Sequence, residues 1–252
     1  MKFVPDAVLN LGRAGILLAR SLAYFPAVIC RARGRHELMR RLYATGIRTL
    51  PVLTVVSLFT GMILALQVGL ELRRFNQEMF LGAAVMLTLM REMAPFVCGI
   101  CLAACVGSAI AAELGTMTVN EEIDALTIMG VPPARFLVAP RVLALTMMSP
   151  LLAFFCCIVG TVGGGIVAST QLGLDFSQYS ASALSMAVTK DLTVGLVKAM
   201  VFGLLIGIIS SNEGLSTTRG ATGVGKATQK SVIVSFLAIL VFGYMITRAF
   251  YQ

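Results

Sequence analysis

The feature that most constrains this chain is a set of long apolar runs with almost no charge. The longest, residues 142–174, contains no Asp, Glu, Lys or Arg. A helix needs about 20 apolar residues to cross a bilayer, and a soluble domain has no place to bury runs of this length. Hydrophobic residues make up 58% of the 252 positions, against about 45–50% in ordinary soluble domains. The sequence therefore predicts an all-α integral membrane protein.

Five of these runs are predicted to be transmembrane helices. They are residues 49–70, 79–112, 142–168, 191–211 and 231–247. The second run would be about 50 Å long as a helix, which exceeds a hydrocarbon core of about 30 Å. It must extend beyond the bilayer, tilt strongly or break near Pro95. In the third run, Gly160 and Gly164 are small residues four apart, a spacing that lets helices approach closely in lipid.

Residues 5–29 precede the spans and have an amphipathic pattern. Asp6, Asn10, Arg13 and Arg20 fall on one stripe of a helix, opposite an apolar side. This pattern predicts an interfacial amphipathic helix that lies in the membrane surface, and a first span with poor ends is the alternative. The chain then divides into two parts. Residues 1–48 form the interfacial helix with a basic cytoplasmic linker, and residues 49–252 form a five-span domain.

The net charge of +8 is explained by membrane orientation better than by nucleic-acid binding. Nine of the 20 Lys and Arg residues precede the first span. With the N-terminus inside, 14 basic residues fall in inner segments and four in outer ones, namely Arg73, Arg74, Lys190 and Arg248. Because cytoplasmic segments carry the excess of Lys and Arg, the sequence predicts an N-in, C-out topology and no nucleic-acid partner.

The cysteines and polar residues of the spans do not form a metal or catalytic pattern. Five of the six cysteines lie inside the apolar runs: Cys98, Cys101, Cys105, Cys156 and Cys157. The one histidine, His36, is far from them in sequence, so we interpret these cysteines as packing residues rather than zinc ligands. No catalytic constellation appears in a span, and the chain is predicted not to be an enzyme.

Two connecting segments are predicted to be loops. Residues 169–190 form the outer loop, and the Gly- and Thr-rich residues 212–230 form an inner one. Within the latter, residues 220–227 read GATGVGKA, one residue short of an ATP-binding P-loop. Ala227 lacks the hydroxyl that would hold Mg²⁺, and a membrane span rather than a strand precedes the segment. We therefore predict a cytoplasmic turn here and no ATP site.

Four charged residues lie within or at the edge of spans: Arg91, Glu92, Asp191 and Lys198. A charge at the bilayer centre costs about 2.5–3.5 kcal/mol on insertion scales, so each needs a partner or water. Arg91 and Glu92 are adjacent and point about 100° apart, so they cannot easily satisfy each other. Lys198 is the predicted partner of Glu92. The four residues form either a polar gate or relay beside a lipid cavity, or structural ion pairs that tie the spans together.

The inner loop at residues 120–130 is predicted to contain a short acidic helix. Asn120 can cap it, and Glu121 and Glu122 in its first turn suit the helix dipole. Ile123 and Leu126 supply an apolar side. Such a helix is suited to docking in a groove on a partner. Its acidity argues against the alternative, a helix lying on the membrane, because the inner leaflet is itself negative.

Several of these stretches together resemble the MlaE/YrbE family of permeases. The longest is Gly107–Val131, which reads GSAIAAELGTMTVNEEIDALTIMGV. The others are LMREMAP at Leu89–Pro95, PARFLVAPRVLA at Pro133–Ala144 and GATGVGKAT at Gly220–Thr228. One departure is that the last span lacks the acidic residue that some relatives carry. The resemblance extends from about residue 45 to the C-terminus.

The resemblance implies a permease subunit of an ABC transporter that moves phospholipids between inner and outer membranes. The expected assembly is a homodimer in the cell inner membrane with two ATPase subunits, a STAS-domain protein and a periplasmic ring of MCE-domain lipid-binding proteins. ATP and Mg²⁺ are expected in the ATPase partner, and no cofactor in this chain. The alternative is an ion-coupled secondary transporter of an amphipathic substrate, which five spans without an internal repeat make less fitting.

The resemblance also assigns roles to particular residues. It implies that the inner helix couples the chain to the ATPase through Glu121, Glu122, Ile123, Asp124, Ala125 and Leu126. It places Arg91, Glu92, Asp191 and Lys198 in a charged cluster near the lipid pocket, and Gln67 at a pocket-lining position near the outer end of the first span.

Overall fold

The computed structural model describes residues 32–218 and 220–251, with scattered positions between 12 and 25. Across these residues the regular structure is helical and contains no strand, as predicted. The predicted interfacial helix at residues 5–29 falls mostly outside the described residues. Of the positions that are described there, Tyr24 and Phe25 pack against buried side chains that include Leu143. The basic segment that follows forms helix α2 (Ala32–Gly46).

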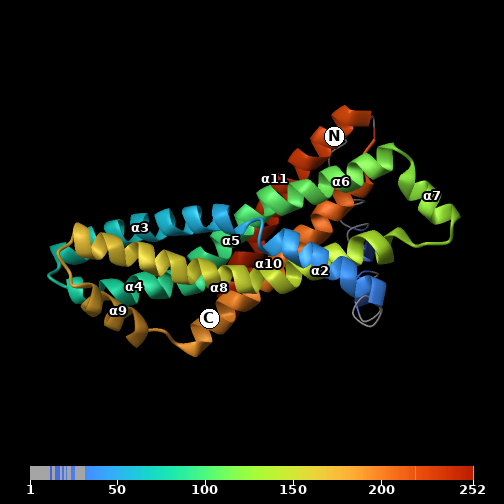
Figure 1. Cartoon of the computed structure of the whole chain (residues 1–252). Helices are drawn as coiled ribbons and strands as arrows, with labels where there is room; N and C mark the ends of the chain where they lie inside the picture. The colour runs from blue at the N-terminus through green and yellow to red at the C-terminus, as the bar shows by residue number, and fades with distance from the viewer. Residues whose placement is uncertain are drawn as a thin grey trace. The chain divides into compact units, whose positions relative to one another are not determined.

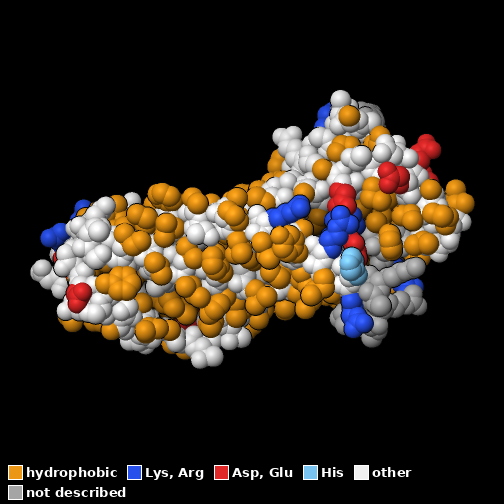
Figure 2. All heavy atoms as spheres, viewed as in Figure 1, with side chains coloured by type: hydrophobic (Ala, Val, Ile, Leu, Met, Phe, Trp, Pro, Cys, Tyr) orange, Lys and Arg blue, Asp and Glu red, His pale blue; other side chains and the backbone are white. Residues whose placement is uncertain are grey.

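Five helical segments have the length and apolar composition of membrane spans, and they coincide with the five predicted runs. Their bounds in the described part of the chain are Arg35–Arg74, Glu78–Val119, Ala134–Thr170, Thr189–Leu215 and Gly220–Tyr251. The main helices within them are α3 (Leu50–Arg74), α8 (Ala139–Thr170), α10 (Thr189–Leu215) and α11 (Gly220–Tyr251). Figure 2 shows hydrophobic side chains over much of the visible surface, as expected for helices that face lipid.

The second span is a series of helical segments rather than one regular helix. It comprises a 3₁₀ turn at Glu78–Phe80, α4 (Leu81–Thr88), α5 (Ala94–Leu102) and α6 (Ser108–Val119), with π-helical turns at Leu89–Met93 and Ala103–Gly107. Pro95 offers no N–H to the carbonyl of Arg91, and its ring crowds that carbonyl. The π-helical turn just before Pro95 accommodates this crowding. The irregularity thus lies where the sequence predicted it, but the helix continues through it.

The chain divides into two compact units. Unit 1 comprises residues 1–49, 102–148 and 201–242, and unit 2 comprises residues 50–101, 149–200 and 243–252. Helices α8, α10 and α11 each contribute part of their length to both units.

In unit 2, α3 packs closely against α8 through small residues. The buried positions of α3 recur every fourth residue: Leu53, Ser57, Gly61, Ala65 and Gly69. A Cβ atom on Gly61 would overlap the backbone of Gly160, and one on Gly163 would overlap the backbone of Leu58. A Cβ on Gly164 would lie 3.3 Å from that of Ala65. The predicted close approach at Gly160 and Gly164 is therefore confirmed.

The predicted outer loop at residues 169–190 is wrong in part, because it contains helix α9 (Phe176–Ser185). Its buried residues, Tyr179 and Ala183, are four apart and face α4, beside which α9 lies (Figure 1). The Tyr179 hydroxyl donates to the Thr161 carbonyl at 3.2 Å, and burial raises the pKa of this phenol. A helix forms here because one apolar stripe can bury itself against α4.

Unit 1 contains α2, α6 and parts of α8, α10 and α11, and it corrects the predicted turn at residues 212–230. Helix α10 continues to Leu215 and α11 begins at Gly220, so only a short link joins them. Gly220 has φ +65°, the left-handed value that favours glycine. Gly214 serves close packing instead, because a Cβ there would lie 2.8 Å from the Cβ of Leu114. A glycine near the end of a span predicts a turn by its composition, whereas Gly214 permits close contact between helices.

The cysteines behave largely as predicted. Cys98, Cys156 and Cys157 are buried in unit 2, where they pack as small apolar residues. Cys105, in contrast, is exposed.

Candidate functional site

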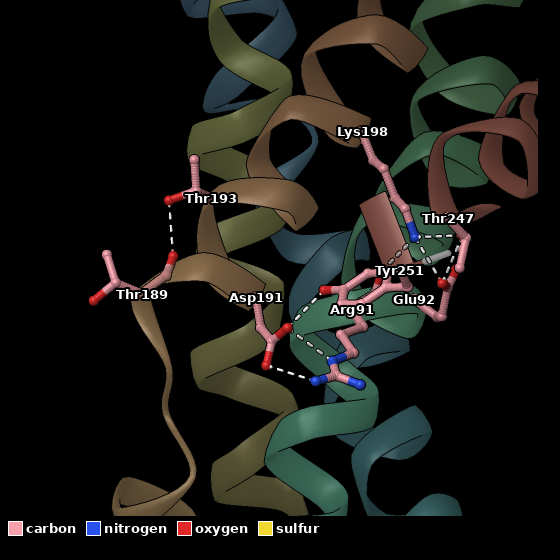
Figure 3. Close-up of polar contacts among 8 residues, drawn as sticks. All are labelled: Arg91, Glu92, Thr189, Asp191, Thr193, Lys198, Thr247 and Tyr251. Atoms are coloured by element: carbon pink, nitrogen blue, oxygen red, sulfur yellow. Dashed lines mark hydrogen bonds and ion pairs between the residues drawn. The ribbon is translucent and has the colours of Figure 1, made fainter. Parts of the chain in front are cut away.

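A charged cluster in unit 2 joins three of the spans. Arg91 and Glu92 come from the π-helical turn at Leu89–Met93, and Asp191 and Lys198 come from α10. The last span adds two hydroxyl groups, from Thr247 and Tyr251 of α11. Figure 3 shows these six side chains converging; we call them the charged cluster.

The first ion pair of the cluster is the predicted one between Lys198 and Glu92. The Lys198 Nζ lies 2.6 Å from Glu92 Oε1, and the lysine side chain is 1% exposed. The ammonium also donates to the Arg91 carbonyl and to Thr247 Oγ1, each at 2.8 Å. Three acceptors match the three N–H groups of the ammonium. The Arg91 carbonyl can accept from Lys198 because Pro95, four residues on, has no N–H to offer it.

The second ion pair joins Arg91 to Asp191. Arg91 Nε and Nη2 lie 2.9 and 3.0 Å from the two Asp191 oxygens, and the aspartate side chain is 4% exposed. The Tyr251 hydroxyl donates to Asp191 Oδ1 at 2.6 Å. Its ring centroid lies 4.6 Å from the Arg91 guanidinium carbon, within the range of a cation–π interaction. Tyr251 therefore contacts both partners.

The cluster has two cations and two carboxylates, so its charges balance. Asp191 and Lys198 are buried, whereas the side chains of Arg91 and Glu92 are 38% and 43% exposed. One member of each pair is thus buried, and the other is open to a second molecule. Gln67 lies on α3 with an exposed side chain, and the described residues show no polar contact between it and the cluster.

Thr247 and Tyr251 are not among the residues that the sequence predicted for this site. They are four residues apart on α11, a spacing that places two side chains on one helix face. Two hydroxyl-bearing residues at this spacing near the end of an apolar helix are a pattern from which their place in the cluster could have been predicted. They supply polar groups from the last span, which lacks a carboxylate at this end.

Replacing Tyr251 with phenylalanine is expected to destabilise unit 2 by about 1.5 kcal/mol, the range for a hydrogen bond to a charged group. The thermal midpoint should fall by about 3–6 °C, at about 2–4 °C per kcal/mol for a chain of this size. Tyr251→Ala should lower it further, because the ring contact with Arg91 is also lost. Tyr244→Phe is the matched control, since Tyr244 is exposed on the same helix. Equal midpoints for the Tyr251→Phe and Tyr244→Phe variants would contradict the assigned hydrogen bond.

The second candidate is the short helix α7 (Glu122–Ile128) of unit 1. Glu121 occupies its N-cap with φ +60°, so the predicted cap by Asn120 is wrong. The Asn120 amide instead donates to the Glu122 side chain at 3.4 Å. A left-handed residue before the helix redirects the chain, and Asn120 is thereby left outside it.

Helix α7 has well-defined ends but no buried side chain. Gly130 follows it with φ +73°. The N–H of Gly130 donates to Thr127, and that of Val131 donates to Leu126, each at 3.0 Å. These two bonds form a Schellman motif, which closes the helix locally. Figure 1 shows α7 extending away from the end of α6.

The residues predicted for coupling all lie on or at the start of α7, from Glu121 to Leu126. Beyond them, Ile128 and Met129 are 87% and 67% exposed. These large apolar side chains on a short helix without a buried residue are available to a partner.

The sequence is similar to a family of known permeases along most of its length. Residues 38–249 match the family described as Permease MlaE. A probable ABC transporter permease protein of Rickettsia prowazekii is 38% identical over 215 residues, which are 85% of this chain and 83% of the relative. The intermembrane phospholipid transport system permease protein MlaE of Haemophilus influenzae is 31% identical over 250 residues, 98% of this chain and 94% of that one. The chloroplastic protein TRIGALACTOSYLDIACYLGLYCEROL 1 of Arabidopsis thaliana is 33% identical over 214 residues, 85% of this chain and 61% of that one.

Proposed function

Because this chain belongs to the MlaE permease family, we propose that it is the membrane subunit of an ABC transporter that moves phospholipids between the inner and outer membranes. The observation that carries this proposal is the family match over residues 38–249, which spans all five membrane helices. The phospholipid substrate is proposed from the similarity to the intermembrane phospholipid transport permease of Haemophilus influenzae. A separate ATPase subunit would bind ATP and Mg²⁺ and supply the energy.

The proposed location is the cell inner membrane, with the N-terminus inside and the C-terminus outside. The excess of Lys and Arg before the first span supports this orientation. The amphipathic pattern of residues 5–29 supports an interfacial helix before the first span.

The proposed assembly is a homodimer with ATPase subunits, a STAS-domain protein and periplasmic MCE-domain proteins. Of the residues in the most apolar stretch of α11, only 11% are buried within the chain. Its exposed apolar side chains include Leu237, Val241 and Met245, at four-residue spacing. Such a face is available for a second protomer or for lipid. The family relationship supports the other partners.

In the proposed cycle, α7 receives the motion of the ATPase. Its residues Glu121, Glu122, Ile123, Asp124, Ala125 and Leu126 would dock in a groove on that subunit. ATP-driven closure would push on α7, the two protomers would rock, and a lipid pocket between them would open or collapse. The Schellman end of α7 supports this role, because a helix with fixed ends transmits a push better than an open loop.

The charged cluster is proposed to lie beside the lipid path, with Gln67 as a lining residue. The part-exposed Arg91 and Glu92 side chains suit a polar gate or relay, and the buried Asp191 and Lys198 suit a structural tie. An ion-coupled secondary transporter would use Glu92 and Lys198 as a relay. It would work without an ATPase and respond to a proton gradient, and family membership does not favour it.

Purification of the tagged chain from its native membrane tests the proposal. We expect an ATPase subunit and phospholipids to co-purify in fixed ratios, as measured by mass spectrometry. In reconstituted vesicles, ATP should drive phospholipid transfer to an acceptor. Transfer that is driven by a proton gradient and needs no ATPase would overturn the proposal.

The substitution Leu126→Arg tests the coupling role of α7. We expect it to weaken ATPase binding at least about thirtyfold, because a hot-spot side chain contributes about 2 kcal/mol or more. Lipid-stimulated ATP hydrolysis should fall with it. Leu184→Arg on α9 is the control, since Leu184 is an exposed leucine outside α7. Unchanged assembly and hydrolysis in the Leu126→Arg complex would show that α7 is not the coupling element.

A further inference from the structure

Unit 1 contains a set of ion pairs that the charged cluster does not include. Arg41 of α2 holds Glu113 of α6 through two bonds, at 2.8 and 2.9 Å. Arg141 of α8 lies 2.8 Å from the same carboxylate. Arg41 also contacts Glu37 at 2.8 Å. In the space-filling view, basic and acidic side chains adjoin in one patch bordered by hydrophobic ones (Figure 2).

A cavity of about 350 Å³ opens beside these ion pairs. Its polar wall includes Arg41, Arg48 and Arg141, and its apolar wall includes Val106 and Ile110. A second hollow of about 270 Å³ shares Arg41, Arg48 and Glu113 with the first and adds Arg40. We call the two hollows together the arginine pocket. The larger volume is at the lower end of the range for small-molecule sites, and the smaller one is just below it.

The arginine pocket has more positive than negative charge. Four arginines, Arg40, Arg41, Arg48 and Arg141, line it, whereas two carboxylates, Glu37 and Glu113, are available to them. Among the described residues, Arg40 and Arg48 make no ion pair. The two positive charges that the carboxylates do not balance suit an anion with one or two negative charges.

Arg141 provides a second, independent indication of a ligand. Its side chain is 2% exposed, yet its Nε has no hydrogen-bond partner among the described residues. A buried donor without an acceptor is costly and uncommon in native structures. Arg141 lines the cavity, and a small shift of its guanidinium would bring the covered Nε to an anion there.

The position of the pocket in the chain places it at a membrane surface. Thr49 begins the first apolar run, Glu113 follows the second and Arg141 precedes the third. The start of one span, the end of the next and the start of the third lie on the same side of any membrane that all three cross. The pocket therefore lies at a membrane surface, with arginines on one wall and Val106 and Ile110 on another.

We propose that the arginine pocket binds the phosphate of an anionic phospholipid from the leaflet on that side of the membrane. Arg40 and Arg48 would contact the phosphate, and Arg141 would turn its Nε toward it, because guanidinium groups match phosphate geometry. An acyl chain would lie along Val106 and Ile110. A zwitterionic lipid fits less well, since its ammonium would face the arginines. The site does not depend on the proposed transport function.

The exposed thiol of Cys105 lines the pocket and reports on its occupancy. The full chain is placed in phosphatidylcholine nanodiscs and treated briefly with N-ethylmaleimide. Peptide mass spectrometry then gives the alkylation rate at each cysteine. We expect saturating dihexanoyl phosphatidic acid to slow alkylation of Cys105 at least fivefold and to leave Cys101 unaffected. Dihexanoyl phosphatidylcholine should have little effect.

Inorganic phosphate distinguishes the lipid from free phosphate. It should protect Cys105 only at concentrations about a hundredfold higher, because it cannot use the apolar wall. Equal potency of inorganic phosphate and dihexanoyl phosphatidic acid would overturn the lipid assignment. No protection by either would overturn the site itself.

Two arginine variants complete the test. Arg48→Gln removes a pocket arginine that holds no ion pair, so the fold should persist. We expect the phosphatidic acid concentration for half-protection to rise about tenfold. Arg74→Gln removes an exposed arginine of α3 that lies outside the pocket, and it should change nothing. Protection that is equally strong in the Arg48→Gln and wild-type chains would overturn the role of the arginines.

Discussion

Replacing Lys198 with methionine is expected to destabilise the chain by about 3 kcal/mol. Methionine keeps the length and apolar stem of lysine but removes the ammonium, which contacts Glu92, Thr247 and the Arg91 carbonyl. Removing one partner of a buried ion pair costs about 3–5 kcal/mol, because the other charge is left uncompensated. The lower end of this energy range applies here, because the Glu92 side chain is part-exposed and water can stabilise its charge.

A thiol-reactive dye can measure this loss, since the chain has no tryptophan and Cys98, Cys156 and Cys157 are buried until it unfolds. The midpoint of the Lys198→Met variant should fall by about 6–12 °C. The double variant Glu92→Gln with Lys198→Met should recover most of this loss, because no charge is then left alone. Lys226→Met, which replaces an exposed lysine of α11 outside the cluster, serves as the control. If the midpoint of the double variant stays as low as that of Lys198→Met, charge imbalance is not the cause of the lower midpoint.

Reversing both charges distinguishes a gate from a structural tie. Each of Glu92→Lys and Lys198→Glu alone should be more damaging than Lys198→Met, since it places like charges together. The double reversal should restore part of the stability. If it also restores phospholipid transfer, the pair is a structural tie. If stability returns without transfer, the positions of the charges matter for the lipid path. No rescue at all would contradict the pairing of Glu92 with Lys198.

The sequence predicted those features that depend on local pattern or on a strong energetic demand. The five spans were predicted from the length of the uninterrupted apolar runs. In lipid, a single helix can hydrogen-bond all of its own backbone N–H and C=O groups internally. The partner of Glu92 could be named because few charges occur in the spans and each must be compensated. The short helix at residues 120–130 follows from its acidic first turn, although its cap differs by one residue.

What could not be predicted depends on contacts between distant segments. Glu113 lies just beyond the second predicted span, and nothing in its own segment indicates that Arg41 and Arg141 reach it from other helices. Helix α9 forms against α4, and that packing has no signature in residues 169–190 alone. The glycines of α10 and α11 resemble turn residues until their neighbours are known, since the same lack of a side chain serves turns and close helix contact.

A single methyl group is expected to have a large effect at Gly61. Its Cβ would overlap the carbonyl oxygen, carbonyl carbon and Cα of Gly160. These are backbone atoms, so no side-chain rotation can relieve the overlap. Helix α3 would have to move away from α8, and contacts would weaken along its buried stripe from Leu53 to Gly69. We expect Gly61→Val to destabilise the chain by about 3 kcal/mol or more, the upper range for overpacking.

Two further substitutions separate overpacking from other effects of mutating α3. Gly61→Ala should cost less than Gly61→Val but more than zero, because even a methyl group meets the Gly160 backbone. Ile63→Ala should stay within about 0.5 kcal/mol of wild type, since Ile63 is exposed on the same helix. The dye-based midpoints should therefore rank Ile63→Ala above Gly61→Ala above Gly61→Val. If Gly61→Val melts within about 2 °C of wild type, the close approach of α3 and α8 at Gly61 is not what holds these helices together.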